Sequence, residues 1–241
     1  MSIFQLIGMP QNIVSYYEKV GKRNLNKNLA RRRLHKEVLS LKIDSFSREE
    51  MITSLNKTIK DYDGKTVVVL EIPAESYLET NAASVHSLLE NGFKGVYLSF
   101  QRPYNNLCSL FGQHGINLDD ILVVDAATAM CGGRCEKSSG CVDVPFETDV
   151  YGIADAVCSS LLNLKGEKRF VFVDSLSTVA LHEPVSKVRS FSEFLIKRVR
   201  ENEGCERVPF IFNVAAGLSK RVCVDGIDSY SDEFVHLGLC T

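Results

Sequence analysis

Residues 66–80, "TVVVLEIPAESYLET", decide the fold of this chain. The first seven are apolar apart from Thr66 and Glu71, and such a short continuous run is typical of a strand buried on both faces. From about residue 76 the pattern changes to that of a helix, which Asn91-Gly92 ends. A buried strand that passes almost directly into a helix is the repeating unit of parallel α/β sheets.

The same alternation continues along the rest of the chain. Amphipathic helices alternate with short Val/Ile/Phe-rich strands, which we expect at 95–100, 121–127, 169–175, 210–214, 221–226 and 233–238. We therefore predict an α/β fold for residues 45–241, with a mostly parallel sheet and helices on both of its faces. Residues 1–44 carry leucines at helical spacing and are predicted to form a separate N-terminal helical arm.

The composition is that of an ordinary globular protein, with 45% hydrophobic and 24% charged residues among 241. No apolar run approaches the length of a membrane span, so a membrane is not expected as a partner. The N-terminal residues show neither a basic leader nor a small-residue cleavage site. Together with eight cysteines, this favours a reducing, cytoplasmic location.

Four segments in a fixed order carry a family resemblance. They are the strand–loop–helix at 67–90, "GVYLSFQRPYNNLCSLFGQHGINLDD" (95–120), "RFVFVDSLSTV" (169–179) and "DSYSDEFVHLG" (228–238). Together they resemble the KaiC-like branch of the RecA-like ATPase superfamily, which is common in archaea. The resemblance covers residues 45–241 and implies a RecA-like sheet. It also implies an ATP site at the strand–helix junction after residue 72.

The junction departs from the phosphate-loop pattern G-x-x-x-x-G-K-[ST] that the resemblance places there. Pro73 and Leu78 stand at the two glycines, Glu79 stands at the lysine, and only Thr80 matches. A proline offers no N–H to a phosphate, and a glutamate repels the charge that the lysine would neutralise. We therefore expect a degenerate nucleotide site without a bound nucleotide cofactor.

The catalytic positions are also incomplete. The resemblance places a water-activating glutamate after the second strand, where this chain has Gln101, and a glutamine is not a general base. Asp174, at the end of the Walker B-like strand, is the acidic residue that remains. The expectation is a pseudo-ATPase that is not an enzyme. A nucleotide sensor with weak ATP binding stays open as an alternative.

The basic arm is the first candidate binding site. Residues 1–42 hold nine basic and two acidic residues, a charge of +7, so with a total of −2 the remaining residues carry −9. A basic segment beside an acidic body favours a polyanionic partner such as RNA or DNA, free or in a particle such as the ribosome. The expected contacts are Lys19, Lys22, Arg23, Lys27, Arg31, Arg32, Arg33 and Lys36.

A cysteine-rich loop is the second candidate site. Cys131, Cys135 and Cys141 fall within the glycine-rich segment "CGGRCEKSSGC". Three thiolates at this spacing could bind zinc with one further ligand, although they do not form the usual C-x2-C pairs. A disulfide, or free thiols without a metal, are the alternatives that the sequence leaves open.

These observations predict a non-catalytic RecA-like scaffold that binds nucleic acid or a ribonucleoprotein through its arm. Family nucleotides sit between subunits, so a chain without one is expected to form a smaller assembly, a homodimer. The alternative is a signalling or regulatory module of KaiC-like type, in which the arm docks onto another protein. The sequence does not distinguish RNA from DNA, because phosphate contacts carry no such information.

Overall fold

The structure is a computed structural model that describes residues 48–61, 66–135, 138–216, 227 and 230–236. The basic arm and the expected strand at 221–226 lie outside the described residues. The helices and strands follow the order α4 (Arg48–Asp61), β1 (Val67–Ile72), η1 (Ala74–Ser76), α5 (Tyr77–Glu90), β2 (Lys94–Ser99), α6 (Tyr104–Gln113), η2 (Leu118–Asp120), β3 (Ile121–Asp125), α7 (Ala126–Met130), β4 (Cys141–Asp143), α8 (Val150–Asn163), β5 (Arg169–Asp174), α9 (Leu176–His182), α10 (Val185–Arg200), β6 (Phe210–Ala215) and β7 (Glu233–His236).

The strands form one seven-stranded sheet in the order β4-β3-β2-β5-β6-β1-β7, and every pairing in it is parallel. The central strands are buried along almost their whole length, which explains their continuous apolar sequences. Parallel pairing places the carboxyl ends of all seven strands at one edge of the sheet. This confirms the predicted fold class, an α/β fold with a parallel sheet.

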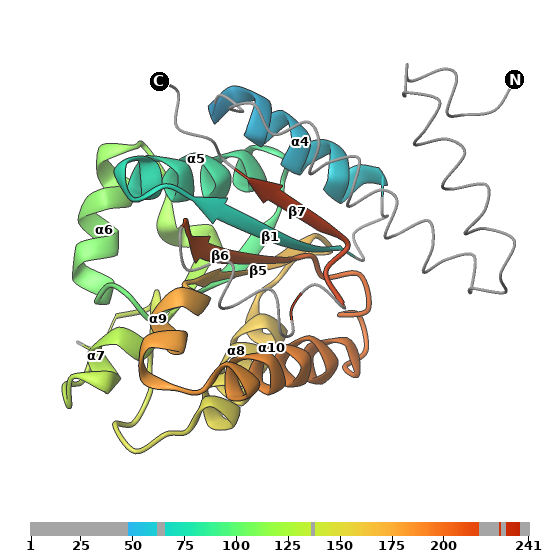
Figure 1. Cartoon of the computed structure of the whole chain (residues 1–241). Helices are drawn as coiled ribbons and strands as arrows, with labels where there is room; N and C mark the ends of the chain where they lie inside the picture. The colour runs from blue at the N-terminus through green and yellow to red at the C-terminus, as the bar shows by residue number, and fades with distance from the viewer. Residues whose placement is uncertain (1–47, 62–65, 136–137, 217–226, 228–229, 237–241) are drawn as a thin grey trace, which may run out of the picture. The chain divides into compact units, whose positions relative to one another are not determined.

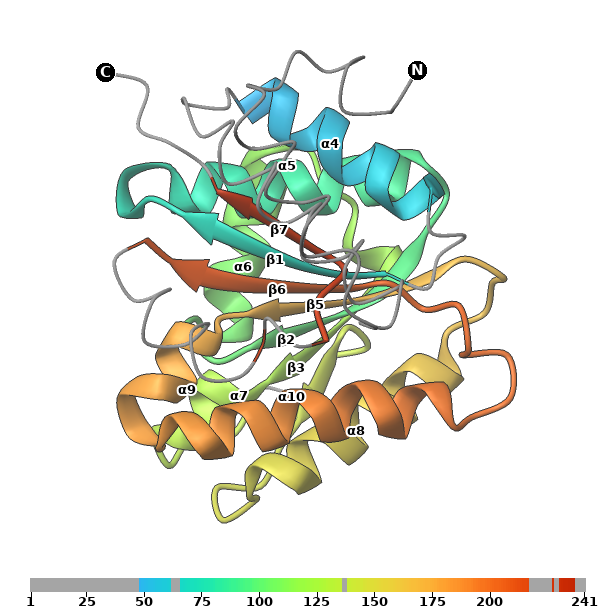
Figure 2. The ribbon, with the colours of Figure 1, turned by 45° about the vertical axis from the view of Figure 1, so that its right-hand side comes forward.

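Helices cover both faces of the sheet, as the sequence predicted (Figure 1). On one face, α5 and α6 pack with Leu55 of α4 against Val68, Leu70 and neighbouring strand residues. On the other face, α8, α9 and α10 pack against the alternate strand positions, such as Val69 and Val171 (Figure 2). The alternation follows from the period of two along a strand, which directs successive side chains to opposite faces.

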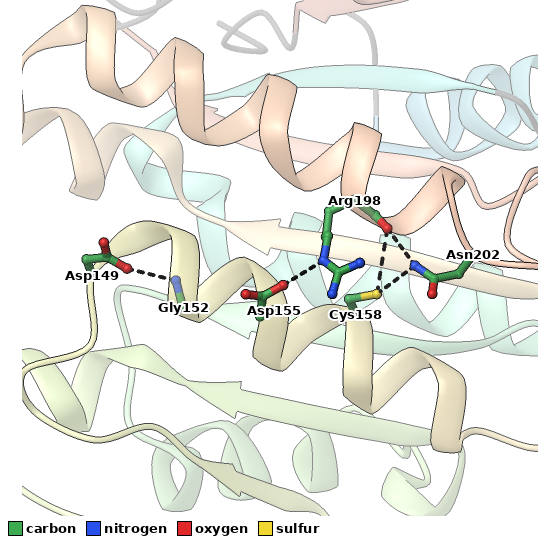
Figure 3. A network of polar contacts seen from close by, with 6 residues as sticks. All are labelled: Asp149, Gly152, Asp155, Cys158, Arg198 and Asn202. Carbon is green, nitrogen blue, oxygen red and sulfur yellow. Dashed lines mark hydrogen bonds and ion pairs between the residues drawn. The ribbon is translucent and has the colours of Figure 1, made fainter.

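A polar network joins α8 to α10 and to Asn202, which follows α10 (Figure 3). Arg198 donates from Nε to Asp155 Oδ1 at 2.7 Å, and Asn202 Nδ2 donates to Cys158 Sγ at 3.1 Å. Burial raises the pKa of the Cys158 thiol, so it stays protonated as part of the helix–helix contact. Arg198 of α10 is therefore paired with Asp155 of α8, an acidic residue of the same chain.

Three elements differ from the sequence expectation. The segment after β3 continues as α7, because Asp125 accepts a hydrogen bond from Thr128 N at 2.8 Å and caps a run of alanines. A short strand, β4, forms at the end of the cysteine-rich loop, and a short helix, α9, lies between β5 and α10. The stop at Asn91-Gly92 is confirmed, with Gly92 at a φ of +79°. Among the described residues, no helix has both the length and the apolar character of a membrane span.

Candidate functional site at the carboxyl edge of the sheet

Two aspartates lie at the carboxyl edge of the sheet, at the ends of the two strands that flank β2. Asp174 is the last residue of β5, and Asp125 is the last residue of β3. Ser99, which ends β2 between them, is in register with both. Each aspartate is only 1% exposed, so each carboxyl group must find its partners within the protein.

Asp174 is held by two tyrosines. Tyr77 donates its phenolic O–H to Oδ1 at 2.5 Å, and Tyr97 donates to Oδ2 at 2.6 Å. Tyr77 begins α5 within the phosphate-loop segment, whereas Tyr97 points from β2 toward the same face, where its ring stacks on Phe172 at 5.1 Å. Both carboxylate oxygens are therefore covered by phenols that are themselves packed in the core.

Burial dominates the electrostatics of this cluster. It raises the pKa of Asp174, although the two phenols and the nearby Arg102 guanidinium act in the opposite direction. Burial and the Asp174 charge raise the pKa of Tyr77 and of Tyr97 above the ordinary value. Both tyrosines therefore remain protonated donors throughout the physiological pH range.

A buried amide pair extends the cluster toward β6. Asn213 Nδ2 donates to Asn81 Oδ1 at 2.5 Å, and both side chains are almost completely buried. Within the described residues, Asn81 Nδ2, Asn213 Oδ1 and Arg102 Nε have no hydrogen-bond partner. The carboxyl edge of the sheet thus contains buried polar side chains whose hydrogen-bonding capacity is only partly used.

The expected nucleotide-site residues differ in their exposure to solvent. Pro73 is buried after β1, and its carbonyl accepts from Ser76 N at 3.3 Å. Glu79 and Gln101 are exposed, whereas Thr80 is 2% exposed. Within the described residues, the hydrogen bonds to the Asp174 carboxylate come from Tyr77 and Tyr97. Sequence reasoning did not identify either tyrosine.

The cysteine-rich loop brings two of its three expected ligands together. Cys135 and Cys141 form a disulfide, one of the alternatives that the sequence left open, whereas Cys131 is free and exposed. One ligand atom each from Asp125, Cys135 and Cys141 lie within 4.8 Å of one another. Cys131 is not a member of this group, and Asp125, which the sequence did not indicate, takes its place.

The arm residues predicted to contact nucleic acid lie outside the described residues, so this part of the site stays a prediction. They are Lys19, Lys22, Arg23, Lys27, Arg31, Arg32, Arg33 and Lys36. The proposed division of the chain at residue 44 also lies outside the described residues.

Comparison with known proteins supports the fold. The chain matches no protein-family model and no curated protein. The uncharacterized protein PH0321 from Pyrococcus horikoshii, solved in complex with an unknown peptide, is similar with a TM-score of 0.56 and 16% identity over 80% of this chain and 84% of that one. The KaiC-like protein PH0186 from Pyrococcus horikoshii OT3 gives a TM-score of 0.42 and 19% identity over 64% and 63% of the two chains.

Proposed function

We propose that this chain is a non-catalytic RecA-like scaffold of KaiC-like type that binds RNA or DNA, free or in a ribonucleoprotein, through its basic N-terminal arm. The observation that carries the non-catalytic part is the pairing of Asp174. An aspartate at 1% exposure whose two oxygens accept from Tyr77 and Tyr97 presents no carboxylate oxygen to the solvent, from which a hydrated magnesium ion would approach.

The surroundings of the phosphate loop support the same conclusion. Pro73 has no N–H to donate, and the position of the phosphate-binding lysine is taken by Glu79, which is exposed to solvent. Glu75 adds a second exposed negative charge to the same turn. Backbone N–H groups that converge on an anion, and a cation above them, are both needed to hold a triphosphate. The residues of this chain do not fit magnesium-ATP.

The charge distribution supports the polyanion part. The acidic body, at −9 against +7 for residues 1–42, does not attract nucleic acid by itself. In its most basic described helix, α10, four of the five cations form ion pairs within the chain: Lys187 pairs with Glu183, Arg189 with Glu193, Lys197 with Glu201 and Arg198 with Asp155. The arm, with its net charge of +7, is therefore the source of positive charge that we propose for contacts with phosphates.

The test compares two charge variants of the full chain in their affinity for total RNA and duplex DNA over a range of salt. The first variant replaces Arg31, Arg32 and Arg33 by Gln. The matched control replaces Lys187, Arg189 and Lys197 of α10 by Gln and removes the same charge. We expect the slope of log affinity against log salt to fall by about 2 to 3 in the arm variant, and to stay unchanged in the control. An equal loss in both variants, or no binding at low salt, would contradict the arm as the contact.

A second candidate function is a protein–protein interaction module. Phe146 and Leu181 are 63% and 65% exposed, and Met130 is 40% exposed. All three follow strand ends at the carboxyl edge, where α7 and α9 lie (Figure 1). PH0321 was solved with a peptide, which makes peptide binding by this fold a reasonable analogy. Peptide or protein capture that survives the arm variant but is lost in a Phe146→Ala, Leu181→Ala double variant would favour this candidate.

A residual nucleotide sensor is tested separately. Equilibrium dialysis with labelled ATP and magnesium is expected to show no binding at micromolar concentrations. Binding that disappears in both Thr80→Ala and Asp174→Asn would overturn the non-catalytic scaffold and favour the sensor.

A further inference from the structure

The starting observation is the group formed by Asp125, Cys135 and Cys141. One ligand atom from each lies within 4.8 Å of the other two, and the three come from two neighbouring strands and the loop before β4. The group is separate from the Asp174 cluster and has no part in the proposed function. Two sulfurs and one carboxylate oxygen are a donor set that suits zinc and excludes magnesium or calcium, which prefer oxygen ligands alone.

Asp125 is oriented for this role by groups that do not use up its acceptor capacity. Its Oδ2 accepts from Tyr104 N at 2.8 Å and from Thr128 Oγ1 at 2.7 Å, and its Oδ1 accepts from Thr128 N at 2.8 Å. An ionised carboxylate offers about four acceptor positions, so one remains on Oδ1. Hydrogen bonds of this kind fix ligating carboxylates in metal sites.

The loop that carries the cysteines is anchored on both sides. Cys141 lies on β4 in register with Val123 of β3, two residues before Asp125. Cys135 donates its backbone N–H to Asp143 Oδ1 at 3.1 Å. Ser138 Oγ lies 3.0 Å from the hydroxyl of Tyr104, which belongs to α6. Strand pairing and side-chain contacts, in addition to the disulfide, therefore anchor this loop beside β3 and Asp125.

The spacing of the two cysteines suits both a bridge and a shared ion. Their Cα atoms are 6.8 Å apart, at the far end of the range in which a disulfide forms. Two thiolates on one tetrahedral zinc ion lie about 3.8 Å apart, further than two bonded sulfurs. A reduced pair at this Cα separation can therefore open onto an ion without a large movement of the backbone.

We infer that the reduced loop binds one zinc-class divalent cation through Asp125, Cys135 and Cys141, and that the disulfide is the metal-free form of the same site. Reduction breaks the sulfur–sulfur bond and takes two electrons and two protons from a dithiol, which itself becomes a disulfide. Binding of the cation then displaces the two thiol protons. Three protein ligands leave the fourth tetrahedral position for water.

The experiment uses the full chain, reduced with a phosphine under anaerobic conditions and titrated with Co²⁺. We expect one cobalt ion per chain, seen as thiolate-to-cobalt charge-transfer absorption together with the visible bands of tetrahedral cobalt, and displaced by one equivalent of Zn²⁺. The oxidised chain should give neither signal. Absence of both signals in the reduced chain would overturn the inference.

Variants then assign the ligands. Cys135→Ser and Cys141→Ser should each abolish the charge-transfer signal at stoichiometric metal, whereas Cys131→Ser is the matched control and should leave it unchanged. Thr128→Val, which removes a donor to Asp125, should weaken binding about tenfold. An equal loss in Cys131→Ser would overturn the assignment and restore the ligand set that the sequence suggested.

Asp125→Asn also puts an amide N–H₂ in place of the Oδ2 acceptor of Tyr104 N and Thr128 Oγ1, so an independent measurement identifies the oxygen ligand. X-ray absorption at the zinc edge of the wild-type chain should show two sulfur neighbours, with oxygen completing the shell. Three sulfur neighbours would exclude Asp125 as proposed. Circular dichroism of each variant before the titration separates loss of binding from loss of folding.

Discussion

Two buried aspartates at the same edge of one sheet have opposite surroundings. Asp174 of β5 is enclosed by the phenols of Tyr77 and Tyr97, whose rings belong to the apolar core. Asp125 of β3 is held by the N–H groups of Tyr104 and Thr128 and by the Thr128 hydroxyl, with two sulfurs of an outer loop nearby. Both are 1% exposed, so burial alone does not distinguish them.

The difference lies in what supplies the hydrogen bonds. At Asp174 the donors are the hydroxyls of two large side chains that are packed in the apolar core. At Asp125 they come mainly from backbone groups and a small side chain, and their number leaves one acceptor position on Oδ1. A carboxylate closed by aromatic side chains has a structural role, whereas one positioned by its local backbone stays available to an ion. Each prediction below tests one side of this contrast.

The largest effect is expected from Asp174→Ala. The substitution leaves two buried phenol O–H groups without an acceptor and a small cavity beside them, and we expect a loss of about 3 kcal/mol in the free energy of unfolding. Urea unfolding with an unchanged m-value would measure it. Glu167→Ala, at an exposed loop position, is the control and should have little effect. A loss as small as that of the control would mean that the phenols do not depend on Asp174.

Removal of one phenol should have the next largest effect. Tyr97→Phe deletes a hydrogen bond to a buried carboxylate without changing the ring packing on Phe172, and is expected to cost about 2 kcal/mol. Tyr151→Phe is the same chemical change at a tyrosine that is 38% exposed, and should be close to neutral. In the Asp174→Asn background the cost of Tyr97→Phe should shrink, because the charged acceptor is gone. Equal costs in both backgrounds would separate Tyr97 from the cluster.

The Asp125 side of the contrast should respond more weakly. Thr128→Val removes the hydroxyl donor to Asp125 Oδ2 but keeps the backbone N–H to Oδ1, so α7 remains capped. We expect a loss of about 1 kcal/mol in unfolding free energy. Thr53→Val on the exposed side of α4 provides the matched control. If Thr128→Val lowered the free energy of unfolding as much as Asp174→Ala, the hydrogen bonds of Asp125 would be as important for stability as those of Asp174.

The pH dependence should separate wild type from Asp174→Asn. Because burial raises the pKa of Asp174 in the folded protein, the native state holds a proton over a pH range in which the unfolded chain has lost it. The stability of the wild type therefore falls, relative to the variant, as pH rises from the unfolded pKa through the folded pKa. When the pH is lowered from 7 toward 4, the wild type should therefore gain stability relative to the Asp174→Asn variant. Parallel unfolding profiles of the two proteins would show that the raised pKa has no effect on stability.

Sequence patterns predicted most of the elements, because each depends on local periodicity. The apolar runs at 66–72 and 169–175 became β1 and β5, and the stop at Asn91-Gly92 was placed correctly. Two short elements were missed for a physical reason. β4 has three residues and exists through its pairing with β3, and α7 depends on a cap that only the end of β3 supplies. Neither leaves a periodic signal of its own.

The candidate sites divide in the same way. Pro73, Leu78 and Glu79 are departures from a phosphate-binding pattern that the sequence shows, because that pattern is contiguous in sequence. Tyr77 lay inside the same segment without being identified, and Tyr97 sat in a strand where an aromatic residue usually means core packing. The loop cysteines were found by composition, whereas Asp125 was not connected with them.

The sequence by itself determined most of the alternation of strands and helices, the departures from the phosphate-loop pattern and the separation of charge between residues 1–42 and the rest. Only the tertiary structure decided what surrounds the two aspartates. Tyr77 and Tyr97 are 97 and 77 positions away from Asp174 along the chain, and parallel pairing of β2 with β5 brings Tyr97 next to it. Strand register is a property of the assembled sheet, so a contact fixed by register is not written in any single stretch of sequence.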